Sequence, residues 1–272
     1  MNAQRVRTVD VGHAVLRVGV RGDGPPIILL TGIGANLEMW DPFERALHGF
    51  QTISIDMPGT GESTSLRRPL RMPGVARLVV KVMDALDIPT ADVLGVSYGG
   101  AVAQQLAHRS PTRVRRLVLA ATAAGVPGFG GVPGDPRGLL AMATTRRYTD
   151  PEYIRAHGHR IYGGGPYQPN PTDLQARLAR PPSVRGYLHQ LWAIQCWTSV
   201  PWLHSLRQPT LVLAGDDDRL MPLVNGRILA MLIPDAHLEI VRGGGHLFIV
   251  QRSSEVAPII TSFLTGADAS HR

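Results

Sequence analysis

The sequence predicts an α/β protein built around a mostly parallel, eight-stranded sheet with helices on both faces. Short apolar runs bounded by turn residues recur along the chain, as buried parallel strands do. Stretches with apolar residues at helical spacing separate these runs, and such an alternation is typical of a parallel sheet covered on both sides. One segment, residues 124–206, interrupts the alternation and predicts a helical insertion in a core formed by residues 1–123 and 207–272.

The expected strands begin with a hairpin. Val6–Val11 and Ala14–Val20 are β-rich runs separated by the turn signal Gly12-His13. Six further apolar runs predict buried strands: Ile27–Leu30, Thr52–Ile55, Val93–Gly95, Leu117–Ala121, Leu211–Ala214 and His237–Val241. Helices are expected around Val75–Leu86, Ala101–His108, Val224–Leu232 and Val256–Phe263.

The insertion holds 9 of the chain's 15 aromatic residues. An aromatic-rich insertion between core strands is a candidate lid over a site at the carboxyl edge of the sheet. The alternative is a small helical subdomain that uses its aromatic rings as its own core. We expect most of the nine to be core and two or three to face a pocket: Phe129, Tyr148, Tyr153, Tyr162, Tyr167, Tyr187, Trp192, Trp197 and Trp202.

The composition of the 272 residues excludes several classes of protein. With 44% hydrophobic and 18% charged residues the chain can bury a full core. No apolar run is long enough to predict a membrane span, and the N-terminus lacks the apolar segment of a signal peptide, so we expect a cytoplasmic protein. Cys196 is the only cysteine, which excludes an intrachain disulfide and a cysteine-based metal cluster.

The basic charge does not indicate a nucleic-acid partner. The net charge is +7, and all but one of the 28 basic residues are arginines, scattered as in Arg146/Arg147 and Arg177/Arg180. No nucleic-acid-binding motif accompanies them, so we interpret them as a solvated surface. Lys81, the single lysine, does not follow a glycine and therefore belongs to no phosphate-binding loop.

The strongest chemical signal is Gly95-Val-Ser-Tyr-Gly99, which fits G-x-S-x-G between a predicted strand and a predicted helix. An immediate strand-to-helix turn forces Ser97 into strained backbone angles and leaves no room for side chains two residues away on either side. The turn exposes the Ser97 hydroxyl at the helix N-terminus, where the dipole favours developing negative charge. Ser97 is therefore the candidate nucleophile.

A serine nucleophile needs a base and an acid that orients it. His246 follows a short strand through Gly243-Gly-Gly near the C-terminus, which fits the order serine, acid, histidine. Three adjacent aspartates follow the strand that ends near Ala214, and the residues alone leave the choice open. We choose Asp218 and keep Asp216 as the alternative. The pair His157/His159 lacks a third ligand nearby, so we interpret it as surface.

Two loops complete the expected site. Thr31-Gly-Ile-Gly34 follows the strand Ile27–Leu30, so the backbone N–H groups of Ile33 and Tyr98 are the expected donors to the oxyanion. The turn Asp56-Met-Pro-Gly-Thr-Gly-Glu-Ser63 is expected to be structural and to have no direct chemical role.

These motifs together resemble the α/β-hydrolase superfamily. The spacing Gly215-x-x-Asp218-x-x-x-Pro222 in that superfamily places the acid at Asp218. Thr31 stands where the superfamily usually has a histidine before the oxyanion glycine. The implied fold is an α/β-hydrolase core with an inserted helical lid.

A closer likeness is to intracellular medium-chain-length polyhydroxyalkanoate depolymerases, over about residues 26–264. The segments that carry it are Gly32–Glu38, Leu117–Gly125, Ile161–Gly165, Trp197-Thr-Ser199 and Gln208–Asp218. Tyr98 departs from the tryptophan typical of that family after the nucleophile. The resemblance implies hydrolysis of a stored polyester, at the surface of a storage granule, to (R)-3-hydroxy acids without a cofactor or metal.

The leading hypothesis is thus a serine esterase that acts on aliphatic polyester through an acyl-enzyme. The same triad also serves carboxylesterases, lactonases and C–C bond hydrolases, so it does not fix the substrate. A ligand sensor on a hydrolase scaffold is the non-enzymatic alternative.

Overall fold

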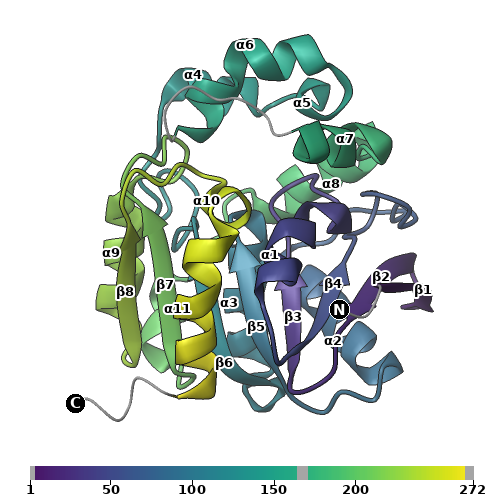
Figure 1. The fold of residues 1–272 in the computed structure, drawn as a ribbon, viewed down its shortest axis with the longest axis vertical. Helices are drawn as coiled ribbons and strands as arrows, with labels where there is room; N and C mark the ends of the chain where they lie inside the picture. Colours follow the sequence, from purple (N-terminus) through teal and green to yellow (C-terminus); the bar gives the residue numbers. More distant parts are fainter. Residues whose placement is uncertain (1–3, 164–170, 267–272) are drawn as a thin grey trace.

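The chain folds around a central sheet. The computed structural model describes residues 4–163 and 171–266 (Figure 1). Within those ranges the sheet has eight strands in the order β1-β2-β4-β3-β5-β6-β7-β8. The strands are β1 (Arg5–Asp10), β2 (Val15–Arg21), β3 (Pro26–Leu30), β4 (Gln51–Ile55), β5 (Ala91–Val96), β6 (Val114–Ala120), β7 (Thr210–Gly215) and β8 (Ala236–Val241).

The strand directions confirm the predicted fold class. β2 pairs antiparallel with β1 and with β4, and all the other neighbours are parallel. The hairpin between β1 and β2 turns at Gly12, whose φ of +84° lies in the left-handed region that favours glycine. Because β3 to β8 all run the same way, the loops that leave their carboxyl ends meet at one edge of the sheet.

Both faces of the central strands are apolar, which explains their unbroken hydrophobic runs in the sequence. Ile28 and Leu30 of β3 belong to one buried layer, and Ile27 and Leu29 belong to the other. All four side chains have an exposure of 0%. Since neither face can meet water, each needs its own layer of helices.

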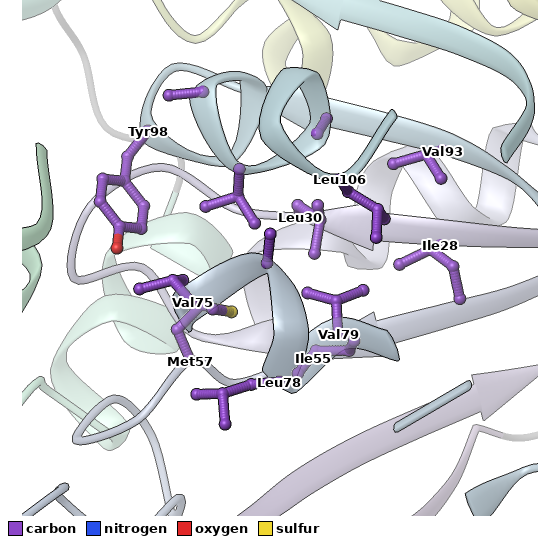
Figure 2. Close-up of a cluster of buried hydrophobic side chains, with 14 of the residues drawn as sticks. Ile28, Leu30, Ile55, Met57, Val75, Leu78, Val79, Val93, Tyr98 and Leu106 are labelled. Atoms are coloured by element: carbon purple, nitrogen blue, oxygen red, sulfur yellow. The ribbon is translucent and has the colours of Figure 1, made fainter. Parts of the chain in front are cut away.

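Helices α2 (Met72–Ala85), α3 (Tyr98–Arg109) and α9 (Leu223–Leu232) supply one layer. Figure 2 shows Val75 and Val79 of α2 in the same apolar cluster as Ile28 and Leu30. The opposite face is covered by η1 (Leu37–Trp40), α1 (Asp41–Ala46), α10 (Phe248–Gln251) and α11 (Ser253–Thr265). The sequence analysis did not predict α1, which is too short to show a helical period.

The segment between β6 and β7 consists mainly of helices. It contains α4 (Pro136–Ala141), α5 (Arg146–Thr149), α6 (Pro151–Tyr162), α7 (Pro171–Ala179), α8 (Val184–Ile194) and η3 (Val200–Ser205). Side chains of Asp135, Asp150 and Ser183 accept hydrogen bonds from the first turns of α4, α6 and α8, as N-caps do. Figure 1 shows α4 to α8 gathered at one end of the sheet. The domain limits 124 and 206 stay a prediction.

The interpretation of the arginines as a solvated surface is wrong for three of them. Arg17, Arg147 and Arg177 are 5%, 4% and 1% exposed. Arg17 is buried because it pairs with the carboxylates of Glu38 and Asp56. Arg147 and Arg177 are surrounded by tyrosine rings, whose faces attract a cation. Composition alone does not distinguish such buried arginines from exposed ones.

Candidate active site

Ser97 lies at the turn between β5 and α3 with a strained backbone. Its φ of +56° and ψ of −117° are angles that residues with a side chain rarely adopt. Two hydrogen bonds hold the turn: the Ser97 N–H donates to the Ala120 carbonyl at 3.0 Å, and the Thr122 hydroxyl donates to the Ser97 carbonyl at 2.8 Å. α3 begins at the next residue, so Ser97 lies at the positive end of the helix dipole.

The two motif glycines are required by close backbone packing. A Cβ atom on Gly95 would lie 2.3 Å from the Gly99 carbonyl oxygen. A Cβ atom on Gly99 would lie 2.1 Å from the Leu30 carbonyl oxygen. Strand, turn and helix can therefore approach each other only with glycine at both positions, as the sequence analysis predicted.

His246 and Asp218 form a buried hydrogen-bonded pair. The His246 Nδ1 atom lies 2.8 Å from Asp218 Oδ2, and both residues are about 5% exposed or less. The other Asp218 oxygen accepts hydrogen bonds from the N–H groups of Leu220 and Met221, each at 2.9 Å. These two bonds fix the carboxylate, which in turn fixes the tautomer and orientation of the imidazole.

Asp216, the alternative acid, has a different environment. Its Oδ1 atom accepts a hydrogen bond from the Gly243 N–H and so braces the glycine turn that precedes His246. The structure pairs the imidazole with Asp218 and not with Asp216. The arrangement therefore favours Asp218 as the residue that orients the base.

Ser97 and His246 line one small cavity of about 50 Å³. In the described part of the chain the Ser97 hydroxyl makes no hydrogen bond with another residue. Such contacts between nucleophile and base are often loose in free enzymes and tighten when substrate binds. The ring of Tyr162 stacks on that of His246 with 6.4 Å between centroids, and the Tyr162 carbonyl accepts the His246 backbone N–H. The candidate base is thus held by both core and insertion.

The loop after β3 brings Ile33 to the same cavity. Tyr98 is the first residue of α3, so its N–H has no acceptor within the helix. The N–H of Ile33 likewise has no acceptor among the residues that the structure describes. Two free backbone donors beside a serine hydroxyl are what an oxyanion hole requires.

Residues of the insertion hold this loop, and the sequence analysis missed them. The Ile33 carbonyl accepts hydrogen bonds from Tyr148 Oη and Arg147 Nη2, both at 2.6 Å. The Gly34 N–H donates to Gln190 Oε1 at 2.8 Å. Within the loop itself the Thr31 hydroxyl donates to the Ala35 carbonyl at 3.0 Å. The adjacent Arg147 and Tyr148 in an aromatic-rich insertion were the only sequence signal for this support.

Ser97 also lines a larger cavity of about 270 Å³. Its lining is almost entirely apolar and comes from both core and insertion, for example Ala101, Val126, Leu191 and Met221. Four aromatic residues of the insertion line the two cavities, more than the two or three expected: Tyr148, Tyr162, Tyr187 and Trp197. Tyr167 lies outside the described residues.

Tyr98 lies where the larger cavity meets the apolar core. Its side chain is 5% exposed and lies in the same apolar cluster as Met57 and Val75 (Figure 2), and it also lines the larger cavity. Burial raises the pKa of the Tyr98 hydroxyl, which has no hydrogen-bond partner among the described residues. Residue 98 therefore contributes an apolar ring to the cavity, not an ionisable group.

The turn that starts at Asp56 is a buried structural junction. Asp56 accepts hydrogen bonds from the Leu37 N–H at 2.7 Å and from Arg17 at 3.2 Å, so it ties η1 to β2. Burial raises the pKa of the Asp56 carboxyl to about 6, although both of these donors favour its ionised form. Neither of the two cavities that Ser97 lines includes Asp56 among its lining residues.

Comparisons with known proteins agree with this geometry. The model of the alpha/beta hydrolase fold matches residues 25–156. A poly(3-hydroxyalkanoate) depolymerase of Ectopseudomonas oleovorans is 47% identical over 95% of this chain and 92% of its own length. A 2-hydroxymuconate semialdehyde hydrolase of Pseudomonas putida is 29% identical over the full length of both chains. The solved structure of a hydrolase from Pseudomonas aeruginosa PA01 superposes with a TM-score of 0.79 at 26% identity, over 97% of this chain and 99% of that one.

The chain belongs to the α/β-hydrolase family. Within that family it is close to the poly(3-hydroxyalkanoate) depolymerases, which the sequence resemblance had indicated. No helix in the described part of the chain is long and apolar enough to cross a membrane.

Proposed function

We propose that this protein is a serine hydrolase that depolymerises medium-chain poly(3-hydroxyalkanoate) to (R)-3-hydroxy acids. The observation that carries the proposal is the strained Ser97 beside the His246–Asp218 pair, at the junction of a small cavity and a larger apolar one. The 47% identity to a poly(3-hydroxyalkanoate) depolymerase supports the substrate class.

In the proposed mechanism Ser97 Oγ attacks the ester carbonyl while His246 Nε2 takes its proton. Asp218 stabilises the imidazolium that forms, and the N–H groups of Ile33 and Tyr98 bind the oxyanion. His246 then gives the proton to the departing alkoxide, which leaves as an alcohol. Water, activated by His246, cleaves the acyl-enzyme and regenerates Ser97.

The apolar cavity supports the assignment of a substrate with medium-length alkyl side chains. Its lining is aliphatic and aromatic, so a pentyl group placed there would leave water for an apolar surface. Contact with the polymer at a storage granule in the cytoplasm belongs to the same proposal. The inactive Ser97→Ala variant should sediment with medium-chain polyester granules if that contact occurs.

The test is an ester panel combined with active-site labelling. The wild type should release 3-hydroxy acids from 3-hydroxyoctanoate oligomers and should react with a fluorophosphonate probe. Ser97→Ala should lose both properties while its thermal denaturation stays that of a folded protein. Turnover above about a thousandth of the wild-type rate in Ser97→Ala would identify another nucleophile.

Two outcomes would replace this function by another. A folded wild type that neither reacts with the fluorophosphonate probe nor hydrolyses any ester would indicate a ligand sensor on a hydrolase scaffold. The name of the Pseudomonas putida relative gives 2-hydroxymuconate semialdehyde as the substrate of that protein. If this chain cleaved a C–C bond in that compound and did not cleave oligoesters, it would be a C–C bond hydrolase.

A further inference from the structure

Arg147 places a buried positive charge beside the candidate nucleophile. It lies on α5 and is 4% exposed, and its side chain lines the cavity of about 50 Å³ that Ser97 and His246 share. The reaction proposed above uses no cation at this place. The partners of Arg147 therefore decide whether it is only structural.

The hydrogen-bond partners of Arg147 in the described part of the chain are uncharged groups. Nη2 donates to the Ile33 carbonyl at 2.6 Å and to Tyr187 Oη at 3.4 Å, and Nη1 donates to Tyr162 Oη at 3.2 Å. Its buried Nε atom has no hydrogen-bond partner among the residues that the structure describes. Within the described residues Arg147 forms no ion pair with a carboxylate. A buried charge without an opposite charge is unfavourable, so an anion that enters the cavity would relieve it.

Arg177 adds a second cation at the same place. It is 1% exposed, lines the same cavity, and donates from Nη1 to Tyr162 Oη at 2.9 Å. Both guanidinium groups lie over the ring of Tyr148, at 4.4 and 5.8 Å from its centroid. Burial favours the neutral form of Arg147, but the surrounding phenol oxygens more than offset this, so its pKa is raised and the group stays charged.

The charge is close to the oxyanion donors. Arg147 Nη2 is 2.6 Å from the Ile33 oxygen, and backbone geometry keeps the N and O atoms of one residue within about 3.6 Å. Nη2 therefore lies within roughly 6 Å of the Ile33 nitrogen. An anionic group a few bonds away from the reacting carbonyl can reach it.

We propose that Arg147, with Arg177 beside it, binds the free carboxylate at the carboxyl end of the polyester, so that the enzyme removes the terminal 3-hydroxy acid. This inference rests on the proposed function. In a 3-hydroxyacyl ester the carboxylate carbon is three bonds from the ester oxygen on the leaving-group side. The chain end is also the only ionised group of such a polymer.

The reaction then balances as an ordinary ester cleavage. The Ser97 Oγ–acyl carbon bond forms, and the bond from the acyl carbon to the terminal 3-hydroxy acid breaks. That acid leaves with the proton that His246 took from Ser97, and its carboxylate remains beside Arg147 until it dissociates. The remaining polymer is the acyl group, which water releases with a new free carboxylate for the next cycle.

The experiment compares two soluble trimers of 3-hydroxyoctanoate, one with a free terminal carboxylate and one with that carboxylate methylated. The wild type should cleave the free acid with a kcat/KM about tenfold or more above that of the methyl ester, as expected for a hydrogen bond to a charged group. In Arg147→Met this ratio should fall to near one. Arg147→Lys, which keeps the charge, should retain part of the preference.

Tyr148→Phe is the matched control. Tyr148 donates to the same Ile33 carbonyl as Arg147 but carries no charge. Loss of its hydroxyl should lower kcat/KM for both trimers by the same factor and leave their ratio unchanged. If Arg147→Met behaves in this way too, Arg147 acts only by holding the Ile33 loop and the inference is overturned.

The two proposals fail in different ways. Equal cleavage of both trimers by the wild type would overturn the carboxylate site and leave the depolymerase function standing. Cleavage of neither trimer, with intact fluorophosphonate labelling, would overturn the proposed function. Competitive inhibition by free 3-hydroxyoctanoate, lost in Arg147→Met, is the second expected result.

Discussion

The Nδ1 atom of His246 lies 2.8 Å from Oδ2 of Asp218, across 28 residues of sequence. The carboxylate that makes this contact is itself held by two backbone N–H groups, those of Leu220 and Met221. The ring of Tyr162, which belongs to the insertion, stacks on the imidazole, and the Tyr162 carbonyl accepts a hydrogen bond from the His246 backbone N–H. The orientation of the candidate base is therefore fixed from both the core and the helices above it.

Replacement of Asp218 by Asn should lower kcat by about three to four orders of magnitude, because a neutral amide no longer favours the required tautomer of His246. Asp216→Asn is the matched control, since Asp216 contacts the Gly243 N–H and not the imidazole. Its effect on kcat should be mild. Steady-state kinetics on a soluble ester measures kcat of both variants. A larger loss of kcat in Asp216→Asn than in Asp218→Asn would assign the acid to Asp216.

Side-chain length should affect turnover through the apolar cavity. A pentyl side chain has four more methylenes than a methyl group, worth up to about 3 kcal/mol if all are buried. If half of that is realised in the transition state, kcat/KM for 3-hydroxyoctanoate oligomers should exceed that for 3-hydroxybutyrate oligomers about tenfold. Acid release from soluble oligomers of equal length measures this ratio.

The same ratio tests where the alkyl group binds. Leu191 lines the apolar cavity, whereas Leu188, on the same helix, is 56% exposed. Leu191→Trp should fill part of the cavity and reduce the ratio of kcat/KM for 3-hydroxyoctanoate oligomers to that for 3-hydroxybutyrate oligomers. Leu188→Trp should leave this ratio at its wild-type value. A wild-type preference for butyrate would remove the medium-chain assignment and leave a generic serine esterase.

Replacement of Gln190 should lower both the free energy of unfolding and kcat. Its Oε1 accepts the Gly34 N–H and its Nε2 donates to the Thr60 hydroxyl, both at 2.8 Å, so α8 holds two loops of the core. Gln190→Met leaves these buried groups unpaired, which should lower the free energy of unfolding by about 1–3 kcal/mol. It should also lower kcat, because the Gly34 loop carries the Ile33 N–H. Urea denaturation and kinetics test both effects, with exposed Leu188→Ala as the control.

Asp56 should make stability depend on pH. Its pKa in the folded protein is about 6, above the ordinary 3.8, so the folded state holds a proton that the unfolded chain has lost between these values. The contribution of Asp56 to stability therefore falls as pH rises through this window. We expect Asp56→Asn to cost about 2 kcal/mol less at pH 7 than at pH 4.5.

Chemical denaturation of wild type and variant at the two pH values measures this difference. The exposed Asp235 provides the control, because Asp235→Asn makes the same substitution at the surface and measures what the substitution costs outside the buried junction. A cost of Asp56→Asn that stays constant or grows toward pH 7 would contradict a raised pKa at Asp56.

The sequence by itself determined the sheet and pointed to the candidate nucleophile and the candidate base. Strands buried on both faces need continuous apolar runs. The turn at Ser97 tolerates only glycine at residues 95 and 99. Both features can therefore be recognised from short stretches of sequence. The short helix α1 was not predictable because six residues show no clear period.

The family spacing indicated Asp218, but only the tertiary structure shows which of the neighbouring aspartates faces His246 and what surrounds Arg147. Asp216 and Asp218 are two residues apart, and only the path of the loop after β7 directs one carboxylate to the imidazole and the other to Gly243. The sequence analysis interpreted Arg147 as a surface residue. In the structure Arg147 lies on helix α5 and contacts the loop at Ile33, more than a hundred residues earlier in the chain. Contacts between segments so far apart depend on how the insertion packs on the core, and no local pattern encodes that.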